Sequence, residues 1–453
     1  MNITFTKKEG CSRLLLLMAG WGMDFRPFTN ITAHGYDIAI TWDYTREDFD
    51  PSIIDDYREI VLIAWSMGVM EADRILSKTQ LPLTLTAAVN GTLSPVSDTE
   101  GIPVEVFKGT LHTMSVPNLQ RFNKRMCGNR ELPAAFESNA PRRDIDNLIE
   151  ELRILEERAS VPSKALRWDV AIIGKRDLIF AAPAQKEAWK DTDIIEIDQP
   201  HLPDFQAIID KLLVDKERVA HCFNDTRNSY DSDATVQDSV AELLSKMLLN
   251  ATERRNFEHV IEIGPGGGQL THRLSESLSI NTLQLWDIAP VSVQCKDGID
   301  CIYITDDAEA RLAETPDYSA DLIVSASTMQ WFNSVPAALK NIERILKPGG
   351  IAAIALYTAG TFDNLSSLTG SALRYCKPEI LRNQLPENCE IKEWSTETFV
   401  RSFDSTRDLL AHIKSTGVNA TRKVNHAILR QMIKENSLLT LEYCCTFIIL
   451  EKH

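Results

Sequence analysis

Three residue types used in nucleophilic catalysis each stand a few residues after a short apolar run of the sequence. Ser66 lies in the stretch Ala-Trp-Ser-Met-Gly, and Asp177 and His201 follow later in the chain. A serine hydroxyl needs a general base, and that base needs an orienting carboxylate. Taken singly, the serine could cap a helix, the aspartate could stand in a surface turn and the histidine could cap a helix. Three suitable types after three separate runs favour a catalytic triad.

The residues around Ser66 suit a sharp turn from strand to helix. In the G-x-S-x-G pattern, small residues allow this turn, and Ala64 here replaces the first glycine. The first apolar run ends in Ala-Gly-Trp-Gly, so the backbone N–H groups of Trp21 and Met67 could form an oxyanion hole. Trp21 could instead simply fill the core. The order serine, acid, histidine is that of the α/β-hydrolases.

The elements that must position these residues form two series of strand-like runs, separated by stretches long enough for helices. The first series is 14–18, 60–64, 85–89, 170–173 and 194–197, and the second is 260–263, 282–286, 322–325, 351–356 and 439–450. Each series predicts a parallel, doubly wound α/β sheet, and the long last run suits an edge or inserted strand. A closing helix at 202–214 and a charged seam at 215–218 place the boundary between domains 1–214 and 215–453.

Composition limits the classes of function. The chain has 453 residues, is 44% hydrophobic and carries a net charge of −16, which argues against nucleic acid as its partner. The run 14–18 is too short for a signal peptide and reads as a strand, and no apolar run is long enough to span a membrane. Nine cysteines without a C-x-x-C pattern favour reduced thiols, no metal site and a cytoplasmic location.

The front half resembles a specific family. The elbow around Ser66, the stretch from Asn90-Gly91-Thr92 to Pro103, and Arg121-Phe122 are similar to the pimeloyl-[acyl-carrier-protein] methyl ester esterases of biotin synthesis, in a compact α/β-hydrolase branch. The resemblance covers roughly residues 10–213. It implies that Ser66, Asp177 and His201 form the triad.

A local excess of basic residues lies between residues 108 and 143 of this acidic chain. A solvated helical face is one interpretation. The other is a lid that docks an acidic acyl carrier protein (ACP), which the resemblance favours. The expected docking residues are Arg121, Lys124, Arg125, Arg142 and Arg143.

A glycine-rich turn opens the second half. Gly264, Gly266 and Gly268 follow the run 260–263, where glycines allow a tight turn and a close approach of the backbone to a ligand. Such a turn alone would equally suit a dinucleotide. Asp287, at the end of the next run, can accept hydrogen bonds from ribose hydroxyls, which both kinds of cofactor carry.

The following motifs resemble a class I S-adenosylmethionine (SAM) methyltransferase with a Rossmann-like fold. They comprise Asp306-Asp307-Ala308, Ser327-Thr328 and Lys347-Pro348-Gly349-Gly350. Together with the segment from Phe223 to Gln237, they are similar to malonyl-[acyl-carrier-protein] O-methyltransferase over roughly residues 216–453. The Pro265-Gly266-Gly267 turn and Asp306 depart from that pattern. The resemblance implies SAM contacts at Tyr230, Gln237, Glu262, Gly264, Gly266, Gly268, Asp287, Asp307, Ala308 and Thr328.

The two resemblances predict a bifunctional enzyme of biotin synthesis, in which one domain methylates malonyl-ACP and the other hydrolyses pimeloyl-ACP methyl ester. A carboxylate is already ionised at neutral pH, so methyl transfer needs no general base. Arg374 is a candidate for contacting that carboxylate, and a surface role is the alternative. Two alternatives stay open: a front half that only docks carrier protein, and activity on small free acids and esters.

Overall fold

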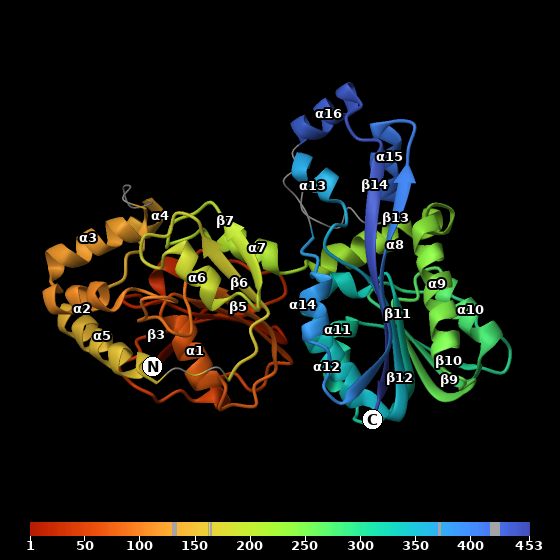
Figure 1. The fold of residues 1–453 in the computed structure, drawn as a ribbon, viewed down its shortest axis with the longest axis horizontal. Coiled ribbons are helices and arrows are strands. Elements are labelled where there is room, and N and C mark those ends of the chain that lie inside the picture. Colours follow the sequence, from red (N-terminus) through yellow and green to blue (C-terminus); the bar gives the residue numbers. More distant parts are fainter. Residues whose placement is uncertain (129–133, 162, 164, 370–372, 417–425) are drawn as a thin grey trace. The chain divides into compact units, whose positions relative to one another are not determined.

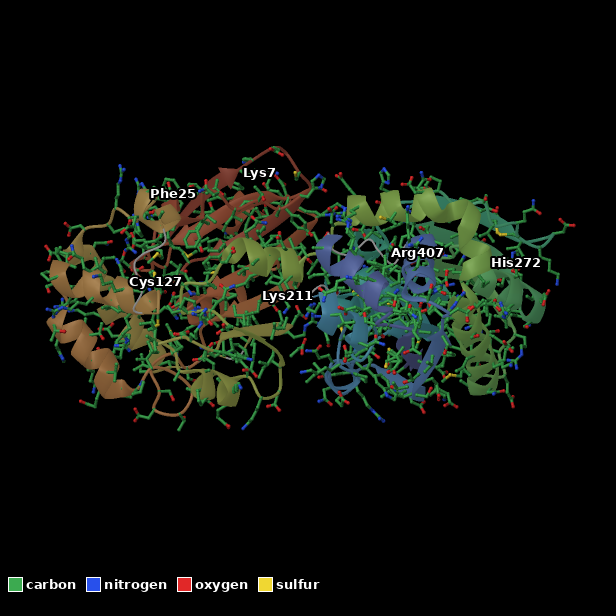
Figure 2. All side chains as sticks on the ribbon, turned by 90° about the horizontal axis from the view of Figure 1, so that it is seen from above. Lys7, Phe25, Cys127, Lys211, His272 and Arg407 are labelled. Atoms are coloured by element: carbon green, nitrogen blue, oxygen red, sulfur yellow. A yellow bond between two sulfur atoms is a disulfide. The ribbon has the colours of Figure 1, made fainter. Side chains whose placement is uncertain are left out.

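The computed structural model describes residues 1–128, 134–161, 163, 165–369, 373–416 and 426–453, and the side chains of residues 135, 226–233 and 426 lie outside that description. The chain divides into two compact units, Met1–Asp210 and Lys211–His453 (Figure 1). Lys211, the first residue of the second unit, is labelled in Figure 2. Each unit is an α/β domain, as predicted, and each is described here by itself.

The first unit is built on one sheet with the strand order β1-β3-β2-β4-β5-β6-β7. All neighbouring strands are parallel except β1, which pairs antiparallel with β3. The central strands are buried along almost their whole length, as a parallel sheet covered on both faces requires. The strands are β1 (Asn2–Lys7), β2 (Arg13–Met18), β3 (Asp37–Trp42), β4 (Glu59–Trp65), β5 (Leu83–Val89), β6 (Val170–Gly174) and β7 (Asp193–Ile197).

The helices of the first unit pack their apolar stripes on this sheet or over the ends of its strands. Leu148, Leu152 and Leu155 of α5, for example, join the buried cluster formed with β2 and β4. The helices are α1 (Gly68–Leu76), α2 (Val104–Thr113), α3 (Val116–Met126), α4 (Ala134–Ser138), α5 (Ile145–Ala159), α6 (Ala182–Ala188) and α7 (Phe205–Leu212), with 3-10 turns at Arg26–Phe28 and Pro51–Ile53.

The second unit has the strand order β10-β9-β8-β11-β12-β14-β13. The first five strands are parallel, and β14 is inserted antiparallel between β12 and β13, which confirms the expectation of an edge or inserted strand at the chain end. The strands are β8 (Asn256–Ile263), β9 (Ser279–Asp287), β10 (Asp300–Thr305), β11 (Ala320–Ala326), β12 (Leu346–Tyr357), β13 (Cys389–Ser402) and β14 (Thr440–Lys452).

Helices cover both faces of this second sheet (Figure 1). Because side chains alternate along a strand, Val260 of β8 joins the buried cluster with α9 and α10, whereas Ile261 and Ile263 join the cluster with α11 and α12. The helices are α8 (Lys216–Asp233), α9 (Thr235–Ala251), α10 (Gln269–Ser277), α11 (Ala308–Glu314), α12 (Val335–Ile345), α13 (Asp363–Thr369), α14 (Pro378–Asn383), α15 (Thr406–Ser415) and α16 (His426–Glu435), with a 3-10 turn at Met329–Trp331.

Some features of the fold differ from the expectations. The two predicted series do not include the strands β1, β3, β10 and β13, because these lie toward the sheet edges and their sequences mix apolar with polar residues. The charged seam at 215–218 is largely the first turn of α8, and Lys216 within it is buried. Among the helices that the structure describes, none is both long and apolar enough to span a membrane.

Candidate active sites

The turn that carries Ser66 is strained in the way a nucleophile elbow requires. Ser66 follows β4 directly, has a φ of 59°, in the left-handed region, and precedes α1. Neighbours without side chains make room for it, since a Cβ on Gly20 would lie 2.9 Å from the Ser66 Cβ and one on Gly91 would overlap the Ser66 carbonyl. Ala64, at the position of the usual first glycine, is fully buried in the strand.

The structure brings the three residues of the proposed triad together. His201 Nε2 lies 3.0 Å from Ser66 Oγ, and His201 Nδ1 lies 2.8 Å from Asp177 Oδ2. All three side chains are buried. The other oxygen of Asp177 accepts hydrogen bonds from the backbone N–H groups of Ile179 and Phe180, at 2.7 and 2.9 Å, so its carboxylate is held in one orientation. This arrangement can deprotonate a serine hydroxyl and stabilise the resulting imidazolium.

Asn90 fixes the loops that carry the acid and the histidine, a role that was not predicted from the sequence. Its side-chain amide donates to the carbonyl oxygens of Pro200 and His201, at 3.0 and 2.9 Å, and its Oδ1 accepts from the backbone N–H of Gly174 at 2.7 Å. Asn90 has a φ of 46° at the end of β5. An asparagine before a glycine at a strand end is the signal that could have indicated it.

A cavity of about 40 Å³ opens on Ser66 and is lined mainly by apolar side chains. Trp21 and Met67 line it, and their backbone N–H groups make no hydrogen bond to another residue in the part of the chain that the structure describes. They therefore remain available as the predicted oxyanion donors. The further lining residues include Ile102, Phe107, Phe122, Leu152 and Ile179.

The predicted docking residues separate into surface and buried positions. Arg121 and Lys124 are exposed on α3, and Arg142 is exposed before α5. Arg125 is half-buried, lines the Ser66 cavity and donates from Nε to the Leu178 carbonyl at 2.8 Å. Arg143 must be removed from the docking set.

Arg143 is a structural residue because it neutralises a buried carboxylate. Its guanidinium lies 2.7 Å from Glu151 and 3.0 Å from Asp43, and its side chain is only 3% exposed. Glu151 also accepts from the backbone N–H of Tyr44 at 2.7 Å. A buried carboxylate of this kind requires a paired cation, and that requirement cannot be read from a run of basic residues.

In the second unit, a glycine loop joins β8 to α10. Gly264, Gly266 and Gly268 have φ values of 69°, 52° and 86°, a region that favours glycine. Gly264 and Gly266 border a pocket of about 420 Å³, whereas Gly268 caps α10 and is not among the residues that line it. The predicted cofactor contacts that line the pocket are Gln237, Glu262, Gly264, Gly266, Asp287, Asp307, Ala308 and Thr328. The side chain of Tyr230 lies outside the described residues.

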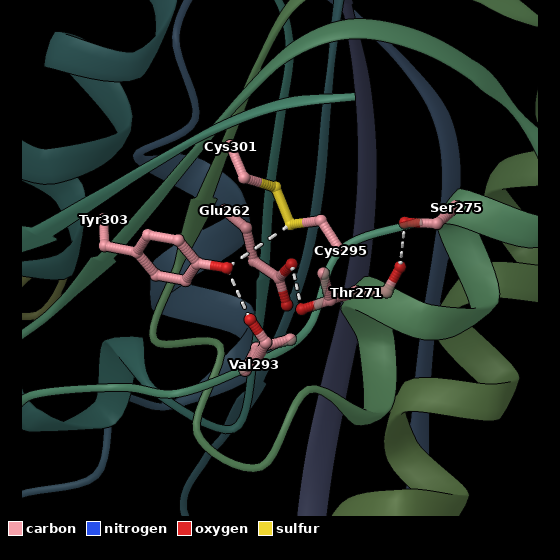
Figure 3. The surroundings of a disulfide bond; sticks show 7 residues. All are labelled: Glu262, Thr271, Ser275, Val293, Cys295, Cys301 and Tyr303. Carbon is pink, nitrogen blue, oxygen red and sulfur yellow. Dashed lines mark hydrogen bonds between the residues drawn. A yellow bond between two sulfur atoms is a disulfide. The ribbon is translucent and has the colours of Figure 1, made fainter. Parts of the chain in front are cut away.

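Buried carboxyl groups dominate the electrostatics of this pocket. Burial raises the pKa of Glu262 to about 7, although Thr271 Oγ1 donates to it at 2.7 Å (Figure 3). Burial also raises the pKa of Asp287, whose carboxylate accepts from the backbone N–H groups of Ala289 at 3.0 Å and Gly266 at 3.4 Å. Both groups therefore retain capacity to bind a donor-rich or cationic ligand.

Lys216 lines the same pocket and was missed as a site residue. Its ammonium lies 3.2 Å from Asp307 and 2.9 Å from Glu309, and the residue is 7% exposed. Glu309 in turn accepts from the backbone N–H groups of Asn333 and Ser334, at 2.9 and 2.8 Å. The start of α8 is thus tied to the loop that presents Asp307.

A disulfide between Cys295 and Cys301 corrects the expectation of uniformly reduced thiols. Their Cα atoms lie 6.5 Å apart, within the range that a disulfide can bridge. Figure 3 shows Tyr303 beside this bond, where its hydroxyl donates to the carbonyl oxygen of Val293 at 2.5 Å. Val293 lines the cofactor pocket, so the bond lies next to the pocket wall. Among the described residues, no cluster of three or more potential metal ligands occurs.

The structure places Arg374 outside the lining of the large pocket. Its guanidinium donates to the carbonyl oxygen of Asn333 at 2.8 Å, and it is not among the residues that line the cofactor pocket. The contact holds the segment after α13 against the loop before α12.

Comparisons with known proteins agree with this division. Residues 1–208 match the family Pimeloyl-ACP methyl esterase BioG, and residues 261–354 match a methyltransferase domain family. A malonyl-[acyl-carrier protein] O-methyltransferase of Bacteroides fragilis is 32% identical over 91% of this chain and 86% of its own length. A protein of the same description from Porphyromonas gingivalis is 32% identical over 46% of this chain and 80% of its own.

Among solved structures, BioG of Haemophilus influenzae is 32% identical, covers 44% of this chain and 94% of its own, and has a TM-score of 0.40. The relative from Bacteroides fragilis spans both units, and the BioG match ends close to the boundary between them. The chain therefore belongs to the malonyl-[acyl-carrier protein] O-methyltransferase family and carries a BioG domain in front of its methyltransferase domain.

Proposed function

We propose that this chain both forms and removes a methyl ester on acyl chains carried by ACP. The second unit would methylate the free carboxyl of malonyl-ACP with SAM, and the first unit would hydrolyse pimeloyl-ACP methyl ester to pimeloyl-ACP and methanol. The observation that carries the proposal is the hydrogen-bonded series Ser66, His201 and Asp177 in a chain that also holds a glycine-loop cofactor pocket.

The residues of the large pocket fit SAM. Its volume of about 420 Å³ lies in the range of small-molecule sites. Asp287 offers acceptors to ribose hydroxyls, Asp307 offers an acceptor to an adenine amino group, and Glu262 offers a carboxylate to an ammonium. When bound, SAM supplies an electrophilic methyl group on a positively charged sulfur. The protein's task is to orient the acceptor against that methyl group and to exclude water.

Hydrolysis would use the triad directly. His201 Nε2 takes the proton of Ser66 as its Oγ attacks the ester carbonyl, and the same proton then goes to the methoxide leaving group, so that methanol departs. A water molecule next attacks the acyl-Ser66 ester, again with His201 as base, and releases the free carboxylate. The backbone N–H groups of Trp21 and Met67 would stabilise the negative oxygen in both steps.

The small cavity of the first site suggests how opposed activities coexist in one chain. Ser66 is 6% exposed and borders a cavity of only about 40 Å³ that is lined mainly by apolar side chains. The ester carbonyl of a malonyl methyl ester is separated from its carrier thioester by a single methylene group, so the carrier would block it from reaching Ser66. A pimeloyl chain is long and apolar enough to cross the cavity. The esterase would therefore spare the newly formed short ester.

Intact-protein mass spectrometry of malonyl-ACP with SAM tests the methyltransferase half. We expect the mass of one methyl group on malonyl-ACP and none on acetyl-ACP, which lacks the free carboxyl. Methylation of free malonate at the same rate as malonyl-ACP would instead favour activity on small acids. No methyl gain on malonyl-ACP would overturn the proposal.

A further inference from the structure

A second, smaller cavity adjoins the cofactor pocket of the methyltransferase unit. It has a volume of about 20 Å³ and shares Phe223, Gln237, Ser327 and Trp331 with the larger pocket. A cavity of this size holds a group of only a few heavy atoms. Because the two cavities share these lining residues, a group bound in the small one would lie beside the ligand of the large one.

Polar groups without protein partners line this cavity. Gln237 is 7% exposed, and its side-chain Oε1 is buried without a hydrogen-bond partner among the described residues. Tyr375 likewise makes no hydrogen bond to another described residue, and burial raises the pKa of its hydroxyl, which therefore stays protonated. Buried polar groups are nearly always satisfied, so an unpartnered amide on a residue that lines both cavities indicates a ligand.

Two further residues that line the small cavity, Ser327 and Gln330, are held in place by hydrogen bonds. Ser327 Oγ donates to the Tyr357 hydroxyl at 3.1 Å, and Gln330 Nε2 donates to the Ser327 carbonyl at 2.6 Å. Ser327 has a φ of 55°, a conformation that non-glycine residues adopt rarely and that is found often at functional sites. The hydroxyl groups of the cavity are thus positioned before any ligand arrives.

The cavity offers neutral hydrogen-bonding groups and no charge. None of the described residues that line it is Lys, Arg, His, Asp or Glu. The amide of Gln237 can present its NH₂ group after a half-turn of its last torsion. Such a site can hold a carboxylate through donated hydrogen bonds, whereas a bound cation would stabilise the ionised reactant more than the transition state, in which that charge disappears.

We propose that this cavity, with Gln237 and Tyr375 as donors, is the acceptor subsite that holds the terminal carboxylate of a short ω-carboxyacyl substrate. This inference rests on the proposed methyltransferase function and adds the residues that select its acceptor. The carboxylate oxygen forms a bond to the methyl carbon as the carbon–sulfur bond breaks. The carboxylate becomes a neutral ester and the sulfonium becomes a neutral thioether, with no proton transferred.

Removal of the Tyr375 hydroxyl tests the assignment. Tyr375→Phe should raise the KM for malonyl-ACP about tenfold, because a hydrogen bond to a charged group is lost. It should leave the dissociation constant of S-adenosylhomocysteine, measured by calorimetry, within twofold of the parent. The matched control is Tyr443→Phe, which deletes a hydroxyl bonded to His412 at 2.8 Å in the same unit but outside the cavity.

A charge placed in the cavity gives a second measurement. Gln237→Glu should repel the carboxylate and raise the KM for malonyl-ACP by a hundredfold or more. If the parent methylates malonyl-ACP but Tyr375→Phe matches Tyr443→Phe in KM, the subsite is assigned wrongly. If Gln237→Glu leaves the KM for malonyl-ACP unchanged, the assignment of this cavity as the acceptor subsite is likewise wrong. If the parent transfers no methyl group to malonyl-ACP, the proposed function fails first.

Discussion

The two candidate sites of this chain differ in whether the protein or its ligands would supply the reacting groups. In the first unit the side chains of the proposed triad already contact one another, at 3.0 and 2.8 Å, beside a cavity of about 40 Å³. In the second unit a pocket of about 420 Å³ is bordered by carboxyl groups whose pKa values burial has raised. Under the proposed function, the first site would carry its own nucleophile, and the second would supply shape and charge to its ligands. Single substitutions should therefore abolish the first activity and weaken the second by degrees.

The largest expected effect is that of Ser66→Ala on ester hydrolysis. Loss of the nucleophile should lower kcat for pimeloyl-ACP methyl ester by roughly 10⁴- to 10⁶-fold, because the remaining residues offer only binding and oxyanion stabilisation. Methyl transfer by the same variant should match the parent, and this serves as the internal control for folding. Hydrolysis at the parental rate would mean that the first unit uses another nucleophile. Equal loss of hydrolysis and methyl transfer would contradict the view that the two sites act separately.

Lys216→Met should weaken the cofactor site by a smaller amount. The variant loses ion pairs to Asp307 and Glu309 and leaves both carboxylates buried without their cation, so the dissociation constant of S-adenosylhomocysteine should rise by about 10- to 100-fold. Calorimetry measures this directly. Lys246→Met is the control, since Lys246 pairs with Glu242 on the surface and such pairs contribute little. Equal affinities in the two variants would show that Lys216 does not shape the pocket.

Glu262→Gln should change how stability depends on pH. Burial raises the pKa of Glu262 from 4.5 to about 7, so between these values the folded chain binds more protons than the unfolded chain. The free energy of unfolding of the unliganded second unit should therefore fall as pH rises through this window, by about 2–3 kcal/mol. Glutamine does not titrate, so the variant should lose this decline. Denaturation at pH 5 and pH 8 measures it.

Glu258→Gln provides the control for that experiment, because Glu258 lies on the same strand but is exposed. It should keep the parental decline of stability with pH. A decline that survives in Glu262→Gln would assign the pH dependence to other groups.

The smallest effect is expected from charge reversal on α3. Replacing Arg121 and Lys124 by glutamate should lower kcat/KM for the carrier-bound ester about tenfold at low salt, because the exposed pair would attract an acidic carrier protein. The difference should shrink as salt rises. A small free methyl ester serves as the control substrate and should be hydrolysed equally by both forms. A similar loss with the free ester would point to damage in the Ser66 cavity.

The sequence predicted the geometry of the candidate sites correctly where a residue type in a given pattern has few structural roles. The triad, the glycine loop and the inserted last strand follow from residue order after apolar runs, because strand ends of a parallel sheet meet at one edge. Prediction from the sequence failed where the role of a residue depends on partners that only the fold brings close to it. Arg143 and Lys216 resemble surface charges in the sequence, yet Glu151 and Glu309 make them buried counter-ions. Tyr375 and Gln237 come together only through the fold, and the Cys295–Cys301 pair follows no spacing rule.

The central claim is that the second unit of this chain forms a methyl ester and that the first unit hydrolyses it. Hydrolysis would occur only when the ester stands on a long acyl chain. The most direct measurement incubates the intact protein with equal amounts of malonyl-ACP methyl ester and pimeloyl-ACP methyl ester and follows both by mass spectrometry. We predict that the pimeloyl ester loses its methyl group while the malonyl ester keeps it. Comparable hydrolysis of the two esters, or of neither, would contradict the account.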